Sequence, residues 1–123
     1  MKAKKLIGNY EYTEKKSKFI GYLYKIENED DVKEILSSLK KEHPKARHMP
    51  HAYILKNTAK KTDDKEPHNT AGIQIYNQLV YNNLNSHLLV VIRYFGGTKL
   101  GAGPLLRAYL NCAKNTITNE KSS

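Results

Sequence analysis

Residues 88–109 read LLVVIRYFGGTKLGAGPLLRAY, and three local patterns follow one another within them. Residues 88–92 are a continuous apolar run, which is typical of a strand buried on both faces. A glycine-rich segment comes next. From Pro104 onward the apolar residues recur at helical spacing, and a first helical turn tolerates proline well. The stretch therefore predicts a buried strand, a tight turn and a helix over residues 104–116.

Two further helices are predicted outside this stretch. Residues 30–43 combine helical spacing of apolar residues with acidic residues at the start and lysines at the end, and Pro44 stops the helix. Residues 71–84 fit a strand or a helix, and we favour the helix.

Strands are predicted before and between these helices. Residues 19–26 are rich in β-formers and predict an edge hairpin or one long strand, and residues 52–55 predict a short strand. Residues 57–69 are almost wholly polar and predict an exposed loop. The order β–α–β–α–β–α predicts an α/β fold, an α+β two-layer sandwich in which about three helices pack against a small mixed sheet.

The composition describes a basic protein of one domain. The chain has 123 residues, a formal net charge of +9 and 27% charged residues. Residues 1–61 carry 15 basic and 8 acidic side chains, whereas residues 62–123 carry 6 and 4. A polyanionic partner such as nucleic acid is therefore expected to bind mainly the first half. No apolar run is long enough to cross a membrane, so no membrane partner is expected, and the N-terminus lacks a signal-peptide pattern. The single cysteine excludes an internal disulfide and indicates a reducing, cytoplasmic setting.

The glycine cluster is a candidate phosphate-binding loop, because glycines let successive backbone N–H groups turn toward an anion at a helix N-terminus. The candidate residues are Gly96, Gly97, Thr98 and Lys99. The pattern matches neither a Walker A loop nor a dinucleotide fingerprint. A tight strand-to-helix turn without a ligand explains it equally well.

Arg93 lies at the end of the predicted buried strand, where a guanidinium needs a carboxylate partner. The polar loop supplies candidates, and we predict that Glu66 pairs with Arg93 and holds the loop over the glycine turn. This structural role is favoured over a catalytic acid.

No metal, cofactor or catalytic nucleophile is predicted. His48 and His51 have no helical metal-binding frame around them, and Cys112 falls on the apolar face of the last helix. The only weak catalytic candidates are Glu66 and His51, the latter as a general base beside the former.

A cluster of lysines suggests a phosphate-binding strand with interleaved aromatic residues for base stacking. The lysines are Lys15, Lys16 and Lys18, and the aromatic residues are Tyr12, Phe19 and Tyr22. A charged edge strand that resists aggregation would give the same pattern. Further phosphate contacts are expected from Arg47, Lys99 and Arg107.

Four segments together resemble the Impact domain family, which includes bacterial YigZ-type proteins and eukaryotic IMPACT. Residues 88–109 are similar to its signature, and three other segments agree in order: residues 14–20 (EKKSKFI), 45–53 (KARHMPHAY) and 64–72 (DKEPHNTAG). The resemblance covers about residues 14–117 and implies one Impact-type domain over residues 1–123, without the ferredoxin-like or RWD domain of longer members.

The resemblance also implies a ribosomal-protein-domain-2-like fold and a role in translation control. The family-motif cleft would contain His48, Glu66, Pro67, Thr70, Gly72, Arg93 and Gly101. This sequence departs from the motif at Lys65, His68, Asn69, Gln74 and Pro104.

Three functions remain open from the sequence. The favoured one is a non-enzymatic module that binds RNA, tRNA or the ribosome. The second is a small phosphate-handling or hydrolytic enzyme that uses the cleft of Glu66, Arg93 and the glycine loop. The third is a protein-interaction domain with a partner in translation control.

Overall fold

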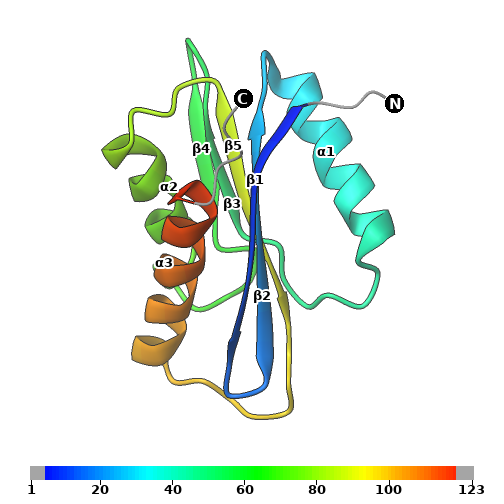
Figure 1. Cartoon of the computed structure of the whole chain (residues 1–123), viewed down its shortest axis with the longest axis vertical. Coiled ribbons are helices and arrows are strands. Elements are labelled where there is room, and N and C mark those ends of the chain that lie inside the picture. The colour runs from blue at the N-terminus through cyan, green and yellow to red at the C-terminus, as the bar shows by residue number, and fades with distance from the viewer. Residues whose placement is uncertain (1–4, 119–123) are drawn as a thin grey trace.

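The computed structural model describes residues 5–118 as a central sheet with helices on both sides (Figure 1). The strands are β1 (Lys5–Glu14), β2 (Ser17–Lys25), β3 (His51–Ile54), β4 (Ala59–Thr62) and β5 (His87–Tyr94), and the helices are α1 (Glu29–Glu42), α2 (Gly72–Tyr81) and α3 (Ala102–Thr118). The strand order is β1-β2-β5-β3-β4, and every neighbouring pair is antiparallel.

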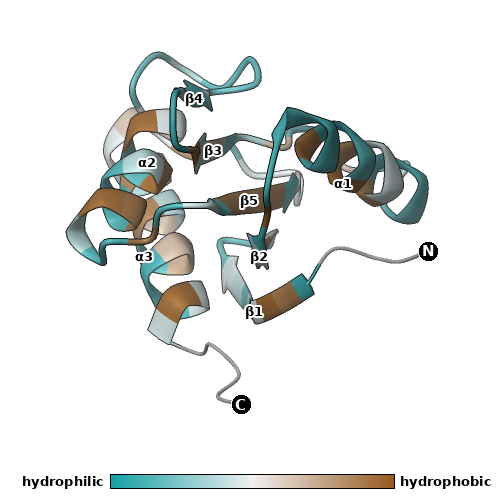
Figure 2. Cartoon of the chain, turned by 90° about the horizontal axis from the view of Figure 1, so that it is seen from above, coloured by the Kyte–Doolittle hydropathy of each residue, from teal (hydrophilic) through white to brown (hydrophobic). Residues whose placement is uncertain are grey.

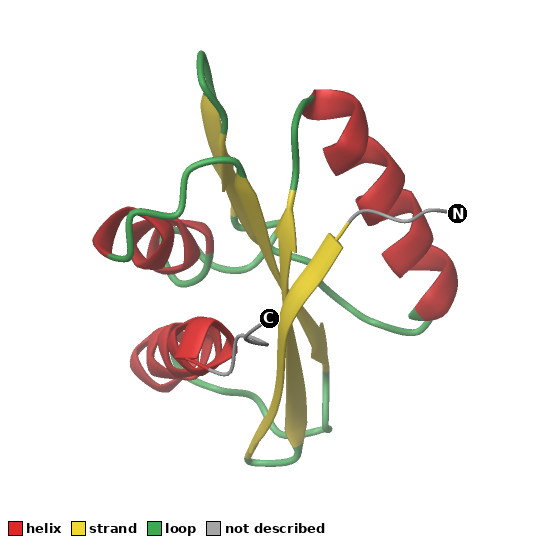
Figure 3. Ribbon diagram, turned by 45° about the horizontal axis from the view of Figure 1, so that its top comes forward, coloured by secondary structure: helices red, strands yellow, loops and turns green. Residues whose placement is uncertain are grey.

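The α/β class, the small sheet and the three helices are confirmed, but two details of the prediction are wrong. The sheet is antiparallel throughout rather than mixed, because its edge pairs are hairpins and the central strand β5 runs opposite to both of its neighbours, β2 and β3. The layers number three rather than two: α2 and α3 cover one face of the sheet and α1 covers the other (Figures 2 and 3). The reason lies in β5, whose residues are buried from His87 to Arg93 and so need cover on both faces.

Alternation along the strands divides the apolar residues between two cores. Leu89 and Val91 of β5 face α2 and α3, in a core that also holds Phe19 and Tyr109. The neighbouring positions face α1, in a core formed by Ile26, Val32, Ile35, Leu39, Met49, Tyr53, Leu88, Val90 and Ile92.

The predicted edge hairpin is present, with β1 reaching back to Lys5 and a register shift between Leu6 and Gly8. Its turn is Lys15–Lys16, and both residues have positive φ angles, of 47° and 72°. This left-handed conformation costs roughly 1–2 kcal/mol in a residue other than glycine. The tip of the hairpin therefore presents two lysines in a strained backbone.

Residues 57–69 are not one exposed loop, contrary to the prediction. Residues 59–62 pair with β3 as the edge strand β4 and close that side of the sheet. After β4 the chain runs over the sheet to α2, and it buries Glu66 and Thr70 on the way.

The three helices lie where the sequence predicts them. Asn28 caps α1, accepting a hydrogen bond from the Asp31 backbone N–H at 2.9 Å. At the start of α2, Asp63 Oδ1 accepts the N–H groups of Ala71 and Gly72 at 3.1 and 2.7 Å. No helix within residues 5–118 has the length and apolar character needed to span a membrane.

Candidate functional site

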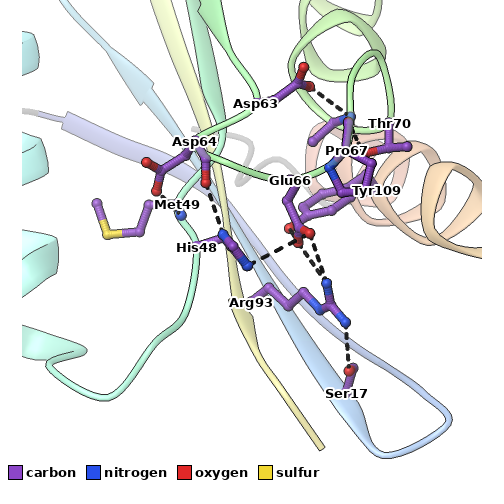
Figure 4. A network of polar contacts seen from close by, with 11 residues as sticks. Ser17, His48, Met49, Asp63, Asp64, Glu66, Pro67, Thr70, Arg93 and Tyr109 are labelled. Atoms are coloured by element: carbon purple, nitrogen blue, oxygen red, sulfur yellow. Dashed lines mark hydrogen bonds and ion pairs between the residues drawn. The ribbon is translucent and has the colours of Figure 1, made fainter. Parts of the chain in front are cut away.

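The predicted pair between Arg93 and Glu66 is present and buried (Figure 4). Arg93 Nη1 donates to Glu66 Oε1 at 2.9 Å and to Oε2 at 2.8 Å, and the two side chains are 8% and 3% exposed. Tyr109 of α3 donates its hydroxyl to Oε2, and Arg93 Nη2 lies 3.5 Å from Ser17 Oγ. The pair thus joins the loop before α2 to strands β5 and β2 and to helix α3.

Tyr109 serves this pair as a hydrogen-bond donor. Burial raises the pKa of its phenol far above the usual value, and the adjacent Glu66 carboxylate raises it further. The phenol therefore keeps its proton and satisfies one oxygen of the buried carboxylate.

His48 takes the position beside Glu66 that the sequence analysis gave to His51. The His48 ring places Nε2 3.7 Å from Glu66 Oε1, and Nδ1 lies 2.9 Å from the Asp64 carbonyl oxygen (Figure 4). Because a carbonyl oxygen only accepts, Nδ1 carries a hydrogen. His51 instead bonds the Met49 carbonyl oxygen at 2.9 Å.

The change of histidine follows from strand pairing. Residue 48 forms an isolated bridge with Arg93, which fixes its backbone directly beside the buried pair. His51 lies further along, opposite Val90, where burial lowers the pKa of its imidazole below the usual value, opposed by the Met49 carbonyl and Asp64. The histidine at ion-pair distance from Glu66 is therefore His48, and a general-base role for His51 stays a prediction.

The acidic loop before α2 is held at both ends by its own aspartates. Asp64 accepts the Met49 backbone N–H at 2.7 Å, and Asp63 caps α2 as described above. Thr70 Oγ1 donates to the Pro67 carbonyl oxygen at 2.6 Å. The resemblance placed Pro67, Thr70 and Gly72 in a cleft, and their contacts in the structure shape this loop.

Glycine is required at two of the motif positions. A Cβ atom on Gly72 would lie 2.8 Å from the Thr62 carbonyl carbon, so α2 starts close against the end of β4. A Cβ atom on Gly96 would collide with the Lys16 backbone. The tip of the β1–β2 hairpin therefore packs directly on the glycine turn after β5.

This contact brings the hairpin tip and the glycine turn together at the bottom of Figure 1, and a third basic segment, at Arg47, joins the end of β5 above them. Lys18 pairs with Tyr94 in the sheet, and its ammonium lies 5.6 Å from that ring. Arg47 is tied to the same strand end through its backbone N–H, which donates to the Arg93 carbonyl oxygen at 2.9 Å. We call this surface the basic end and define it as Lys15, Lys16, Lys18, Arg47 and residues 95–99.

Two predicted phosphate contacts have different surroundings. Lys99 belongs to the exposed glycine turn, in which Gly97 has a φ of 90° with open space around it. Arg107 lies on α3, where it lines a pocket of about 410 Å³ with Tyr12 and Glu14. Gly101, which the resemblance placed in the cleft, accepts the Leu105 N–H at 2.9 Å at the start of α3.

An open groove of about 430 Å³ lies beside the C-terminus of α1 and meets the basic end at Arg47. It is lined by Lys40, His43, Pro44, Ala46, Arg47, His48, Met49 and Asp64. His43 Nε2 lies 2.9 Å from Tyr22 Oη, and its Nδ1 lies 2.5 Å from Tyr94 Oη. Both ring nitrogens are therefore held, and this wall of the groove is fixed.

The aromatic residues predicted to stack on bases are engaged in the fold instead. Phe19 is fully buried, Tyr12 donates to Glu14 at 3.0 Å, and the hydroxyl of Tyr22 contacts His43. The exposed ring at this end belongs to Phe95, which the sequence analysis missed. The position of Phe95 just after the predicted buried strand could have indicated an exposed aromatic ring at the end of the sheet.

The described residues offer no arrangement for a metal ion. No group of three or more histidine, cysteine, aspartate or glutamate side chains within residues 5–118 is placed to hold one. Cys112 is buried, and burial raises its pKa to about 12, so that its thiol stays protonated at neutral pH.

Comparison with known sequences gives one consistent result. The family model described as the Impact N-terminal domain matches residues 15–117. The IMPACT family member YvyE of Bacillus subtilis is 40% identical over 105 residues, which are 83% of this chain and 48% of that protein. The IMPACT family member YigZ of Escherichia coli is 33% identical over 117 residues, 89% of this chain and 57% of that protein. The chain spans about half the length of the curated relatives it matches.

Solved structures agree with the fold. A crystal structure described as that of a hypothetical protein has a TM-score of 0.88 and 29% identity, and the match covers 100% of this chain and 64% of that one. The structure of the two-domain translational regulator Yih1 has a TM-score of 0.57 and 18% identity, covering 98% of this chain and 48% of that one. At that identity the second likeness concerns the fold alone.

Proposed function

The chain belongs to the Impact N-terminal domain family, and on that premise we propose that it acts in translation control by binding RNA, as tRNA or on the ribosome, through the basic end. A relative in fold, Yih1, is described as a translational regulator. Translation takes place in the cytoplasm on RNA-rich particles, and a domain of net charge +9 is suited to that polyanionic partner.

The observation that carries the proposal is the convergence of three basic segments at the end of β5, where Lys16 packs on Gly96 and the Arg47 N–H bonds the Arg93 carbonyl oxygen. The hairpin tip, the segment before β3 and the turn after β5 are distant in sequence, yet their basic side chains share one end of the sheet. Phosphate contacts from such a surface supply most of the affinity for nucleic acid.

Carboxylates near the basic end are engaged within the domain. Asp64 accepts the Met49 N–H, Glu14 accepts the Tyr12 hydroxyl, and Glu66 is buried against Arg93. Glu11 lies 3.9 Å from the Lys18 ammonium, but both side chains are exposed, and such a surface pair is weak enough for a phosphate to replace it.

The buried pair of Arg93 and Glu66 also holds the backbone of the basic end in place. The Arg93 backbone bonds residues 47 and 48, so the same residue fixes the loop through its side chain and presents Arg47 through its main chain. Both oxygens of Glu66 are occupied by Arg93, with Tyr109 on one of them. This geometry supports a clamp rather than the general base that the enzyme alternative requires.

Co-sedimentation with ribosomes and with total RNA over a salt series tests the proposal. We expect saturable binding whose logarithm falls with log salt at a slope of about −3, as for about four phosphate contacts on single strands. The triple variant Lys15→Glu/Lys16→Glu/Lys18→Glu should lose it.

The matched control changes the same charge at the opposite end. Lys25, Lys33 and Lys56 are exposed and lie near the start of β5, in α1 and after β3. Their triple change to Glu should leave most binding intact. Equal losses in both variants, or no binding by the natural chain at low salt, would contradict the proposal.

A further inference from the structure

Phe95 is the feature of the basic end that the phosphate contacts leave unexplained. It is 37% exposed, one of four large hydrophobic residues exposed within residues 5–118. The other three, Leu6, Val80 and Tyr81, lie on β1 and α2. Phe95 alone of the four belongs to the surface where lysines and Arg47 gather.

Two guanidinium groups fix the surroundings of this ring. The Arg47 guanidinium carbon lies 5.1 Å from the ring centroid, and that of Arg93 lies 5.9 Å away. Arg93 is buried and held by Glu66, whereas Arg47 is exposed. The ring thus has one permanent support in Arg93, and in Arg47 it has an exposed cation that a ligand can displace.

The groove of about 430 Å³ adjoins this ring through Arg47. That volume falls within the range of small-ligand sites, which is enough for one nucleotide unit. Lys40 and Arg47 line the groove and can contact a phosphate. The His43 ring, which is hydrogen-bonded through both nitrogens, forms a rigid wall of the groove. Asp64, the carboxylate in the groove, already accepts the Met49 N–H.

We propose that Phe95 stacks on an unpaired RNA base whose sugar and phosphate lie in the groove beside Arg47 and Lys40. This inference rests on the proposed function and specifies its ligand as single-stranded RNA. Every base has a π face that an aromatic side chain can stack on, and displacement by the base frees Arg47 for a phosphate. Bases inside a duplex are already stacked and cannot reach the ring.

The chain contains no tryptophan, so Phe95→Trp places a single indole fluorophore at the proposed contact. The natural chain and its variants are titrated with a fluorescein-labelled 12-nucleotide RNA of mixed sequence, alone and annealed to its complement. We expect the single strand to bind at least about tenfold more tightly than the duplex. An unlabelled single strand of the same sequence should quench the indole emission of the Phe95→Trp variant, and the unlabelled duplex should not.

The variant Phe95→Leu removes the stacking face and keeps an apolar side chain. It should weaken single-strand binding by about tenfold and leave duplex binding unchanged, while Tyr81→Leu, at the exposed position on α2, changes neither. Circular dichroism checks that each variant is folded.

The outcomes separate the two proposals. Equal affinity for both RNAs, or full single-strand binding by Phe95→Leu, overturns the stacking site and leaves RNA binding by the basic end in place. Failure of the natural chain to bind either RNA overturns the stacking site, and failure in the co-sedimentation with ribosomes and total RNA as well overturns both proposals.

Discussion

One nitrogen of Arg93, Nη1, lies within 2.9 Å of both carboxylate oxygens of Glu66, inside the protein. The guanidinium Nε is buried and has no hydrogen-bond partner among the described residues. Burying these two charges costs desolvation free energy, which their mutual attraction offsets. Removing one partner leaves the other charge buried and unpaired, and this should destabilise the fold.

We expect Glu66→Gln to lower the free energy of unfolding by about 3–5 kcal/mol, because it leaves the Arg93 charge buried without a counter-ion. Urea unfolding followed by circular dichroism measures the loss. The double variant Glu66→Leu/Arg93→Met removes both charges and should recover much of the stability. An unchanged midpoint for Glu66→Gln would show that the pair does not hold the loop.

The turn Lys15–Lys16 places two charged side chains at positions where other residues would make the protein more stable. Both residues have positive φ angles, and Asn-Gly is the pair that such a two-residue hairpin turn prefers. Lys15→Asn/Lys16→Gly should therefore raise the free energy of unfolding by about 1 kcal/mol. RNA co-sedimentation should weaken at the same time, because two phosphate contacts are removed. A variant that is more stable and binds RNA as before would place the site elsewhere.

Stability should fall in mild acid partly through His51. Burial holds its pKa below the usual value of about 6.5, so the unfolded chain binds a proton first as the pH falls. The free energy of unfolding therefore decreases below about pH 6.5. His51→Gln should flatten this decrease in urea midpoints measured from about pH 7.5 to about 5.5, and His68→Gln, at an exposed position, is the control. Identical slopes for the natural chain and His51→Gln would contradict the assignment.

Unfolding at alkaline pH should be driven by ionisation of the buried tyrosine side chains. Burial, with smaller contributions from nearby carboxylates, raises the pKa of Tyr22 and of Tyr53 to about 12, and it raises that of Tyr109 further. An unfolded tyrosine ionises near pH 10, so the stability that these protonated phenols contribute is lost as the pH rises above about 10. Tyrosinate absorbance should therefore rise in two stages, the second together with loss of helical circular dichroism. One step near pH 10 for all nine tyrosines of the folded chain would contradict the burial.

Periodicity and charge pairing predicted the parts of the fold that depend on burial. The strand over residues 88–92 and the helix over residues 30–43 are recognisable because their apolar residues face a core. Arg93 led to Glu66 for a related reason, since a charge on a buried strand requires a partner and the polar loop contained the candidates.

Features set by pairing and by turns were missed. Strand β4 has polar side chains and is held at the sheet edge by backbone hydrogen bonds to β3, so its sequence is typical of a loop. Spacing alone did not place His48 beside Glu66, although the family resemblance put both in one cleft, because the bridge of His48 to Arg93 depends on strand pairing. Phe95 is exposed because β5 ends at Tyr94 and the glycine turn then directs the chain away from the sheet, and the sequence does not reveal where the strand ends.

Backbone amide NMR of the ¹⁵N-labelled chain, titrated with the single-stranded 12-nucleotide RNA, tests the central claim most directly. Binding through the basic end predicts shift changes concentrated at Lys15–Lys18, at Arg47–His48 and from Tyr94 to Lys99, and these changes should disappear at high salt. Shift changes centred on the exposed residues of α2, or a spectrum that RNA leaves unaltered, would contradict it.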